Sequence, residues 1–333
     1  MNLNIWQILL LALLQGVTEL FPISSLGHTV ILPGLLGWGD LVRNTQFLPL
    51  IVALHLGTSI ALVIYFWRDW YQVGRTLVVS IKQGEIRTGT QEWVGWLIII
   101  GCIPAGLLGV ALETPLKQLF ASPIIAASFL IVNGGILFVG EMQRRRAEKR
   151  AATVEATRES ISLPIDQQET QPLPPQLSTG AGKAPVLMAT SSTAQPRLKT
   201  STVRPLTDLS WKEAVIVGFA QSLALIPGIS RSGVTMVAGL GVRLSHEDAA
   251  RYSFLLGTPL IGAAALLEVP QLFGLPATTL LLVLIGMIIA GVAAFLSTHF
   301  LLKYFENGRL YPFAYYCWGV GLCALIFFLT IHH

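Results

Sequence analysis

Charged residues are scarce in this sequence of 333 residues: Asp, Glu, Lys and Arg make up 12%, whereas apolar residues make up 53%. Soluble domains carry about twice that charged fraction, so the composition excludes an ordinary soluble fold. Several long stretches lack Asp, Glu, Lys and Arg, among them Trp93–Leu112 and Pro270–Leu302. Because about 20 apolar residues are enough for a helix to cross a bilayer, the sequence predicts an all-α integral membrane protein.

Cysteine is also rare. Cys102, Cys317 and Cys323 all lie in apolar stretches, where thiols are usually packing residues, and their spacing does not indicate a metal site. The net charge of +4 gives no reason to expect a nucleic-acid partner. The positions of the Lys and Arg residues are more informative, because they indicate which loops face the cytoplasm.

One short motif occurs twice. Residues 15–28 read QGVTELFPISSLGH, and residues 221–233 read QSLALIPGISRSG. An alignment without a gap pairs four residues of one copy with four of the other: Gln15 with Gln221, Ile23 with Ile229, Ser24 with Ser230 and Gly27 with Gly233. Glu19, His28 and Arg231 are ionisable groups in apolar surroundings, where such groups are costly and indicate function. We expect the two copies to meet and to form one polar site inside the membrane.

Each copy interrupts an apolar segment. In residues 3–38, a predicted helix ends at Pro22 and is followed by a piece too short to cross a bilayer. Residues 211–242 repeat this plan around Pro227. Broken backbone at membrane depth needs cover from protein or from a wet cavity, so we expect two re-entrant helical hairpins. The alternative is a kinked spanning helix followed by a loop.

Three transmembrane helices are expected after each hairpin. They are predicted at about 47–67, 93–112 and 119–140 in the first half, and at about 248–268, 275–297 and 311–331 in the second. Because three is an odd number, the two halves must insert with opposite orientation. The sequence therefore predicts two inverted-topology repeats, 1–141 and 211–333, with a site near the midplane.

The Lys and Arg residues predict which loops face the cytoplasm. They gather in 68–92 and after position 141, whereas 113–118 holds only Lys117. Because positive loops face the cytoplasm, the first two segments are expected inside and both chain termini outside. Residues 142–210 are rich in Thr, Gln, Pro, Ala and Ser, which predicts a disordered cytoplasmic linker. A regulatory or partner-binding segment is the alternative.

The second copy of the motif predicts an anion site. Free backbone N–H groups at the start of a helix bind anions, and the guanidinium of Arg231 suits phosphate oxygens. The candidate phosphate-binding residues are Ser24, Gly228, Ser230, Arg231, Ser232 and Gly233. The alternative is that Arg231 only pairs with Glu19 and holds the hairpins together.

The first copy supplies acid–base and metal-binding groups. Gln15 and Glu19 share one helix face and could hold a divalent cation together with phosphate oxygens, or Glu19 could act as a general base. Ser25 and His28 could form a nucleophile–base pair, or His28 could protonate the leaving phosphate. His55 is interpreted as a hydrogen bonder within its own helix. The set suits phosphoryl transfer on a substrate with a phosphate head and a lipid tail.

These motifs resemble the signatures of the undecaprenyl-diphosphate phosphatase family, integral membrane enzymes of the bacitracin-resistance type. The first signature matches at Gln15, Glu19, Pro22, Ser24, Ser25, Gly27 and His28, and the second at Pro227, Gly228, Ser230, Arg231, Ser232 and Gly233. The resemblance covers about 1–141 and 211–331. Two residues depart from it: Gln15 stands where many relatives have Glu, and Leu26 stands where Thr is frequent.

The resemblance implies hydrolysis of undecaprenyl diphosphate to undecaprenyl phosphate and inorganic phosphate. This reaction recycles the lipid carrier for cell-wall synthesis and confers bacitracin resistance. It also implies a divalent cation, Mg²⁺ or Ca²⁺, as cofactor, with Gln15 and Glu19 as metal ligands. The catalytic residues would be Glu19, Ser25, His28 and Arg231, with Ser25 as nucleophile unless an activated water attacks directly.

The resemblance further implies a multi-pass protein of the bacterial plasma (inner) membrane with its active site facing the periplasm. The expected partners are the lipid substrate and the bilayer, and a homodimer is compatible with them. The competing interpretation is an inverted-repeat transporter or flippase of a phosphorylated lipid or another anion, because broken helices in inverted repeats are typical of transporters.

Overall fold

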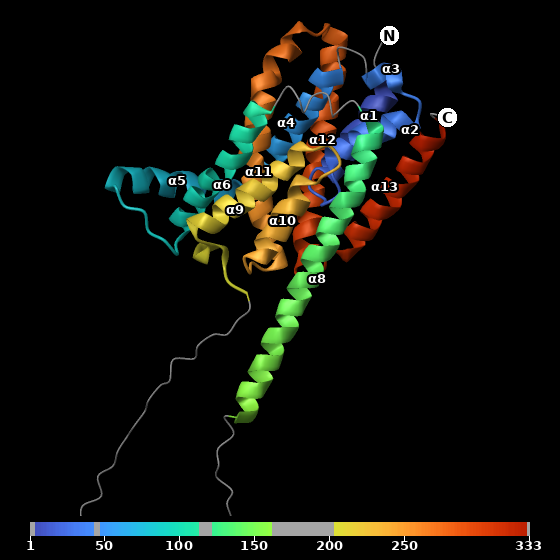
Figure 1. Cartoon of the computed structure of the whole chain (residues 1–333). Coiled ribbons are helices and arrows are strands. Elements are labelled where there is room, and N and C mark those ends of the chain that lie inside the picture. Colours follow the sequence, from blue (N-terminus) through green and yellow to red (C-terminus); the bar gives the residue numbers. More distant parts are fainter. Residues whose placement is uncertain (1–3, 43–46, 113–121, 162–202, 332–333) are drawn as a thin grey trace, which may run out of the picture. The chain divides into compact units, whose positions relative to one another are not determined.

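The computed structural model describes residues 4–42, 47–112, 122–161 and 203–331, and every element in these ranges is helical (Figure 1). Five of these helices are long and apolar enough to cross a membrane, and a sixth crossing results if α4 and α5 are counted as one bent span. The described chain is thus an all-helical, multi-pass membrane protein, as the composition predicts.

The elements follow the order expected from the sequence. In the first half they are α1 (Ile5–Thr18), α2 (Ser25–Leu35), α3 (Gly39–Val42), α4 (Phe47–Tyr65), α5 (Trp67–Gln83), α6 (Gln91–Ala111) and α8 (Pro123–Ile161). In the second half they are η1 (Leu206–Asp208), α9 (Trp211–Ser222), η2 (Leu223–Leu225), α10 (Arg231–Gly241), α11 (His246–Glu268), η3 (Val269–Gly274), α12 (Ala277–Phe305) and α13 (Tyr311–Ile331). The helices α4, α6, α8, α11, α12 and α13 overlap the six predicted spans.

Two segments expected as loop or linker are helical. The first is α5, which occupies much of the expected loop 68–92 and is bent by 78° from α4. The second is the end of α8, which continues to Ile161 and so enters the expected linker 142–210. Ala, Glu, Lys and Arg dominate 141–158, and these strong helix formers extend the helix. Residues 162–202 of that linker lie outside the described residues.

The chain divides into two compact units, one of residues 1–145 with 203–333 and one of residues 146–202. Both copies of the motif belong to the first unit. Each copy lies at a break between two short helices, with 14 and 11 residues in α1 and α2 and 12 and 11 residues in α9 and α10. None of the four has the length of about 20 residues that a crossing requires.

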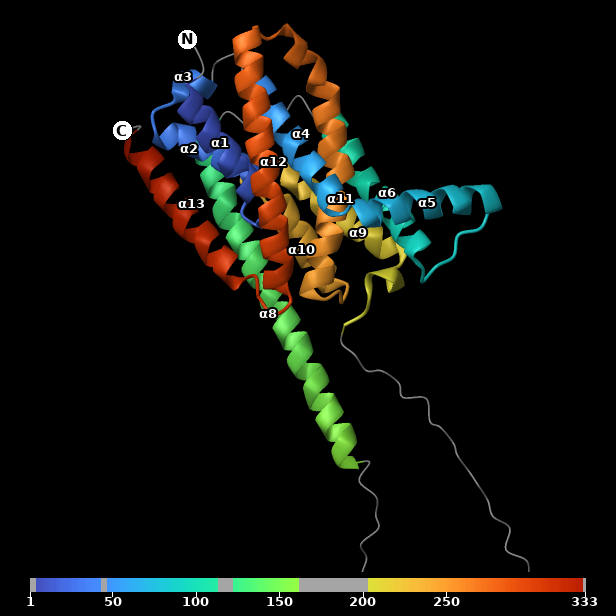
Figure 2. The same cartoon turned by 180° about the vertical axis from the view of Figure 1, so that it is seen from behind.

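Within the first unit, each pair of short helices packs against the other half of the chain. Helix α1 lies along α12, and α9 lies along α6 (Figure 1 and Figure 2). Glycines allow this close approach, because an added Cβ on Gly16 would collide with the carbonyl oxygen of Ala290, and one on Gly218 with that of Gly101. The largest apolar core also contains residues of both halves, so the halves are interleaved.

A buried asparagine joins the two breaks. The Nδ2 of Asn133, on α8, donates to the carbonyl oxygen of Pro22 at 3.0 Å, and its Oδ1 accepts from the backbone N–H of Ser230 at 3.0 Å. Ser232 Oγ also donates across the junction, to the carbonyl oxygen of Phe21 at 3.0 Å. Buried polar groups paired in this way hold the breaks together. The two motif copies therefore meet, as the sequence analysis predicts.

Candidate active site

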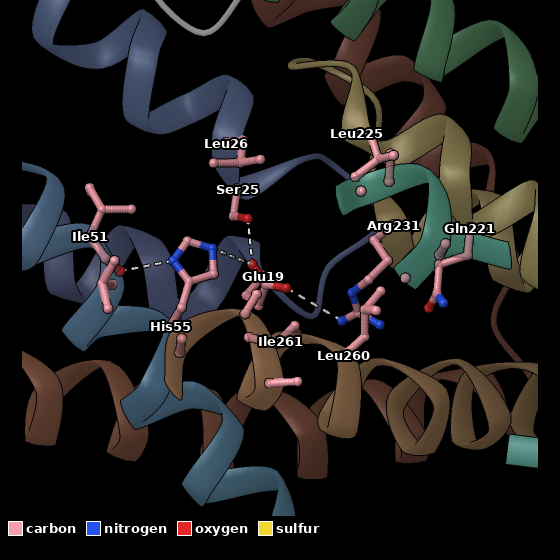
Figure 3. A pocket seen from close by; sticks show the side chains of 18 of the residues that line it. Glu19, Ser25, Leu26, Ile51, His55, Gln221, Leu225, Arg231, Leu260 and Ile261 are labelled. Atoms are coloured by element: carbon pink, nitrogen blue, oxygen red, sulfur yellow. Dashed lines mark hydrogen bonds and ion pairs between the residues drawn. The ribbon is translucent and has the colours of Figure 1, made fainter. Parts of the chain in front are cut away.

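A cavity of about 680 Å³ lies where the two breaks meet (Figure 3). Apolar residues from α4, α6, η2 and α11 form most of its wall. Eight polar or charged residues also line it: Glu19, Ser24, Ser25, His55, Gln221, Ser230, Arg231 and Glu268. A largely apolar cavity of this volume with a few convergent polar groups is typical of a small-molecule site.

Glu19 is the centre of the polar network. Its Oε2 accepts hydrogen bonds from Gln15 Nε2 at 3.0 Å and from Ser25 Oγ at 2.5 Å, while its Oε1 lies 3.4 Å from Arg231 Nη2. Its side chain is only 6% exposed. A buried carboxylate needs such donors and a nearby cation to remain charged, so Glu19 and Arg231 stabilise each other at the cavity wall.

The hydroxyl of Ser25 pairs with Glu19 and not with His28, so the prediction of a Ser25–His28 pair is wrong. His28 Nδ1 lies 2.7 Å from the carbonyl oxygen of Ser24, and Nε2 lies 3.0 Å from the hydroxyl of Tyr316 on α13. The His28 ring also stacks on the Tyr316 ring. His28 does not line the cavity, and its catalytic role stays a prediction.

Arg231 is the first residue of α10, and two contacts hold its guanidinium at the cavity wall. Its Nη1 donates to the carbonyl oxygen of Ser253 at 3.0 Å, and Nη2 faces Glu19. Its Nε is buried without a hydrogen-bond partner among the described residues. Gly257 on α11 leaves room for the guanidinium, because an added Cβ would collide with it. Arg231 is thus held in place while one of its donors stays free.

The other predicted phosphate-binding residues fall into two groups. Ser24 and Ser230 line the cavity, and their hydroxyls cap the helices α2 and α10 by accepting backbone N–H groups. Ser232, Gly228 and Gly233 do not line the cavity. Ser232 is fully buried and bonds to the first break, and Gly228 has a φ of 99° and touches the backbone of α8, which only glycine permits.

Three further polar or charged residues line the cavity although the sequence analysis did not assign them to the site: His55, Gln221 and Glu268. His55 Nδ1 lies 2.9 Å from the carbonyl oxygen of Ile51, as expected of a hydrogen bonder within its helix, but its Nε2 lies 3.6 Å from Glu19 Oε2. Gln221 is 2% exposed, and neither end of its amide has a partner among the described residues. The alignment of Gln221 with Gln15 was the signal that could have identified it.

Oxygen atoms that could bind a metal ion lie on Glu19 and on its neighbour Gln15. Among the described residues no cluster of three or more His, Cys, Asp or Glu side chains could hold a metal. However, Gln15 Oε1 is buried without a partner among them, and it lies on the side chain that bonds to Glu19. Because Mg²⁺ is commonly held by one or two carboxylates plus substrate phosphates, these residues fit a cation that is shared with a phosphate ligand, although of the two only Glu19 lines the cavity.

The chain is similar to known proteins over nearly its whole length. Residues 8–163 and 180–323 match the family model described as Bacitracin resistance protein BacA. Undecaprenyl-diphosphatase 2 of Frankia alni is 45% identical, over 95% of this chain and 96% of its own. The undecaprenyl-diphosphatase of Mycolicibacterium paratuberculosis is 40% identical, over 94% and 93% of the two chains, and that of Acidiphilium cryptum is 38% identical, over 95% of both.

Proposed function

The chain belongs to the family of the bacitracin resistance protein BacA, and from this membership we propose that it hydrolyses undecaprenyl diphosphate to undecaprenyl phosphate and inorganic phosphate. Such a reaction would recycle the lipid carrier for cell-wall synthesis and confer bacitracin resistance. One observation carries the proposal: the Ser25 hydroxyl donates to the Glu19 carboxylate at 2.5 Å, in a mostly apolar cavity that Arg231 also lines. This is a nucleophile beside a base and a phosphate-binding cation.

The proposed reaction begins with attack of Ser25 Oγ on the terminal phosphorus. The hydroxyl proton passes to Glu19, the bond from this phosphorus to the bridging oxygen breaks, and Glu19 gives the proton to the departing undecaprenyl phosphate. Water then attacks the phosphoserine and loses a proton to Glu19, which returns it to the Ser25 oxygen as inorganic phosphate leaves. Arg231 stabilises the charge on the phosphoryl oxygens.

Direct attack by a water molecule that Glu19 activates is the second mechanism. The two differ in one product: only the serine mechanism forms a phosphoserine. Rapid acid quenching of the enzyme with substrate labelled in the terminal phosphate separates them. Label retained on the wild-type protein, and absent from Ser25→Ala, supports the serine mechanism, whereas label absent from both supports direct attack by water.

A divalent cation, Mg²⁺ or Ca²⁺, is the proposed cofactor. Glu19 and the free Oε1 of Gln15 would hold it together with oxygens of the diphosphate. When bound, it would neutralise phosphate charge. A chelator is expected to abolish phosphate release, and added Mg²⁺ or Ca²⁺ to restore it. Full activity in the chelator would remove the cation from the proposal.

The proposed architecture is a pair of inverted-topology repeats in the bacterial plasma membrane, with the site open to the periplasm. The short helices on either side of both breaks support re-entrant hairpins. Helix α1 packs on α12 of the second half, and α9 packs on α6 of the first half. Two related halves would produce such reciprocal packing. The Lys and Arg residues after position 141 support a cytoplasmic location for the segment 142–210.

Phosphate release by the purified chain in detergent tests the function, because no transport can occur there. We expect release from undecaprenyl diphosphate, and a fall of about 10²- to 10⁴-fold in kcat for Glu19→Gln, the usual contribution of a general base. Thermal unfolding of the variant serves as the folding control. A well-folded wild type that binds the lipid but releases no phosphate would instead favour a transporter or flippase.

A further inference from the structure

The amide of Gln221 is buried but has no partner. The side chain lies near the end of α9 and lines the cavity. Its residue is 2% exposed, and both Oε1 and Nε2 lack a hydrogen bond among the described residues. Buried polar groups are nearly always paired in native proteins. An amide left unpaired at a cavity wall therefore indicates a ligand that pairs with it.

Comparison of the two motif copies shows why Gln221 lacks a protein partner. In the first copy, Gln15 donates to Glu19, four residues later on the same side of the helix. In the second copy, the residue four positions after Gln221 is Leu225. The second copy thus has the amide without the carboxylate, and Leu225 adds an apolar side chain to the cavity wall.

The surroundings of Gln221 favour an anion. The amide of Gln221 and the guanidinium of Arg231 lie on the same side of the cavity, away from His55 (Figure 3). Arg231 Nε is likewise buried without a partner among the described residues. Phosphate oxygens are strong acceptors for such N–H donors. The two side chains together form an unsatisfied donor surface.

We propose that Gln221 donates a hydrogen bond to the phosphate that stays on the lipid, which is the leaving group of the reaction. The inference rests on the proposed function. Attack by Ser25 fixes the terminal phosphate beside Glu19, and Arg231 lies next to Glu19 at 3.4 Å. A diphosphate that extends past Arg231 reaches Gln221, and the apolar wall that includes Leu225 then receives the lipid tail.

The test compares Gln221→Met, which keeps the size and removes the hydrogen bonds, with Gln221→Glu, which adds a charge that repels phosphate. Ser222→Ala is the matched control, because among the described residues the hydroxyl of Ser222 bonds only to the carbonyl oxygen of Gly218 in its own helix, at 3.2 Å, and Ser222 does not line the cavity. For each protein we would measure kcat and KM with undecaprenyl diphosphate, the inhibition constants of farnesyl monophosphate and of inorganic phosphate, and thermal unfolding.

We expect Gln221→Met to raise KM and the inhibition constant of farnesyl monophosphate by about 10- to 100-fold, the usual effect of losing a hydrogen bond to a charged group. Gln221→Glu should raise both further. The inhibition constant of inorganic phosphate should stay within about twofold, because that product corresponds to the terminal phosphate. The melting temperature of Gln221→Met should be unchanged or higher, since an unpaired buried amide is removed.

Three results would overturn the inference. One is unchanged inhibition by farnesyl monophosphate in both variants of Gln221. Another is an equal rise for farnesyl monophosphate and inorganic phosphate, which would place Gln221 at the terminal phosphate. The third is a lower melting temperature for Gln221→Met with a matching loss of kcat, which indicates a structural role. Failure of the proposed function is recognised separately, because the wild type would then release no phosphate at all.

Discussion

Glu19 contacts several polar side chains, and a bound phosphate would compete with it for one of them. Glu19 accepts hydrogen bonds from Gln15 and Ser25 and faces Arg231. Phosphate oxygens would compete with Glu19 for the guanidinium of Arg231. Binding of a diphosphate would thus rearrange the contacts between Glu19 and Arg231.

At the residue scale, we predict that Arg231→Lys is nearly as damaging as Arg231→Ala. A guanidinium donates to the Ser253 carbonyl and faces Glu19 with separate nitrogens, whereas an ammonium is a single point charge and cannot bind phosphate in a bidentate way. The ratio kcat/KM for phosphate release should fall by about 10²-fold or more in both variants. Near-normal turnover of the lysine variant would contradict the assigned role of Arg231.

At the element scale, α11 carries Gly257 at the point where the guanidinium of Arg231 packs against this helix. We predict that Gly257→Ala lowers kcat/KM by at least about tenfold, because the added methyl group collides with the guanidinium and even small displacements from the productive geometry are costly. Gly135→Ala in α8 is the matched control, since an added Cβ there has no atom within 4 Å. Equal activity of the two variants would contradict the prediction.

The short helix α5 has two different exposed stripes. One is apolar and consists of Trp67, Tyr71, Val78 and Ile81, each more than half exposed. The other is basic and recurs every seven residues, at Arg68, Arg75 and Lys82. A helix with an apolar stripe beside a basic stripe is typical of one that lies in the membrane interface and contacts anionic headgroups. Its bend of 78° from α4 suits this position.

We therefore predict that α5 lies in the cytoplasmic interface of the bilayer. Spin labels on Val78→Cys and Arg75→Cys, in a chain whose three native cysteines are replaced, should report different surroundings in liposomes. The label at position 78 should be more accessible to oxygen, which dissolves in lipid, and the label at position 75 to a water-soluble nickel complex. Equal access of the nickel complex to both labels would show that α5 lies in water.

At the scale of the whole molecule, the candidate site is assembled from both halves. Glu19 and Ser25 come from the first motif copy and Arg231 from the second, while α4 and α11 close the cavity. Neither half therefore contains the site alone. A homodimer, which the sequence permits, is not needed to complete the cavity and stays a prediction.

We predict that deleting 164–179 leaves phosphate release and membrane insertion largely intact. The family model matches the chain on both sides of this segment but not within it. Activity within about twofold of the wild type is the expected result, measured on purified protein with equal yield from the membrane fraction. A well-folded but inactive deletion would show that the segment takes part in function.

The sequence by itself predicted the membrane class, because charge-free stretches are readable without coordinates, and it predicted that the two motif copies meet. It did not predict the helical structure of α5 or the length of α8. Lys and Arg indicate a loop at 68–92, and the Thr, Gln, Pro, Ala and Ser content of 142–210 indicates a linker, but Ala, Glu, Lys and Arg also form helices well. At these positions helix propensity and the expectation of a loop or linker disagree, and the structure shows helices.

The candidate site, too, was predicted from the sequence only in part. Spacing along the chain predicted the contact of Gln15 with Glu19, because residues four apart share a helix face. The repeated motif brought Ser25 and Arg231 forward as candidates, and both line the cavity. Only the tertiary structure decided that Ser25 bonds to Glu19, and that His28 contacts Tyr316 and the Ser24 carbonyl. It likewise brought His55 and Gln221 to the cavity. The direction of a side chain depends on partners from distant segments, which local spacing does not specify.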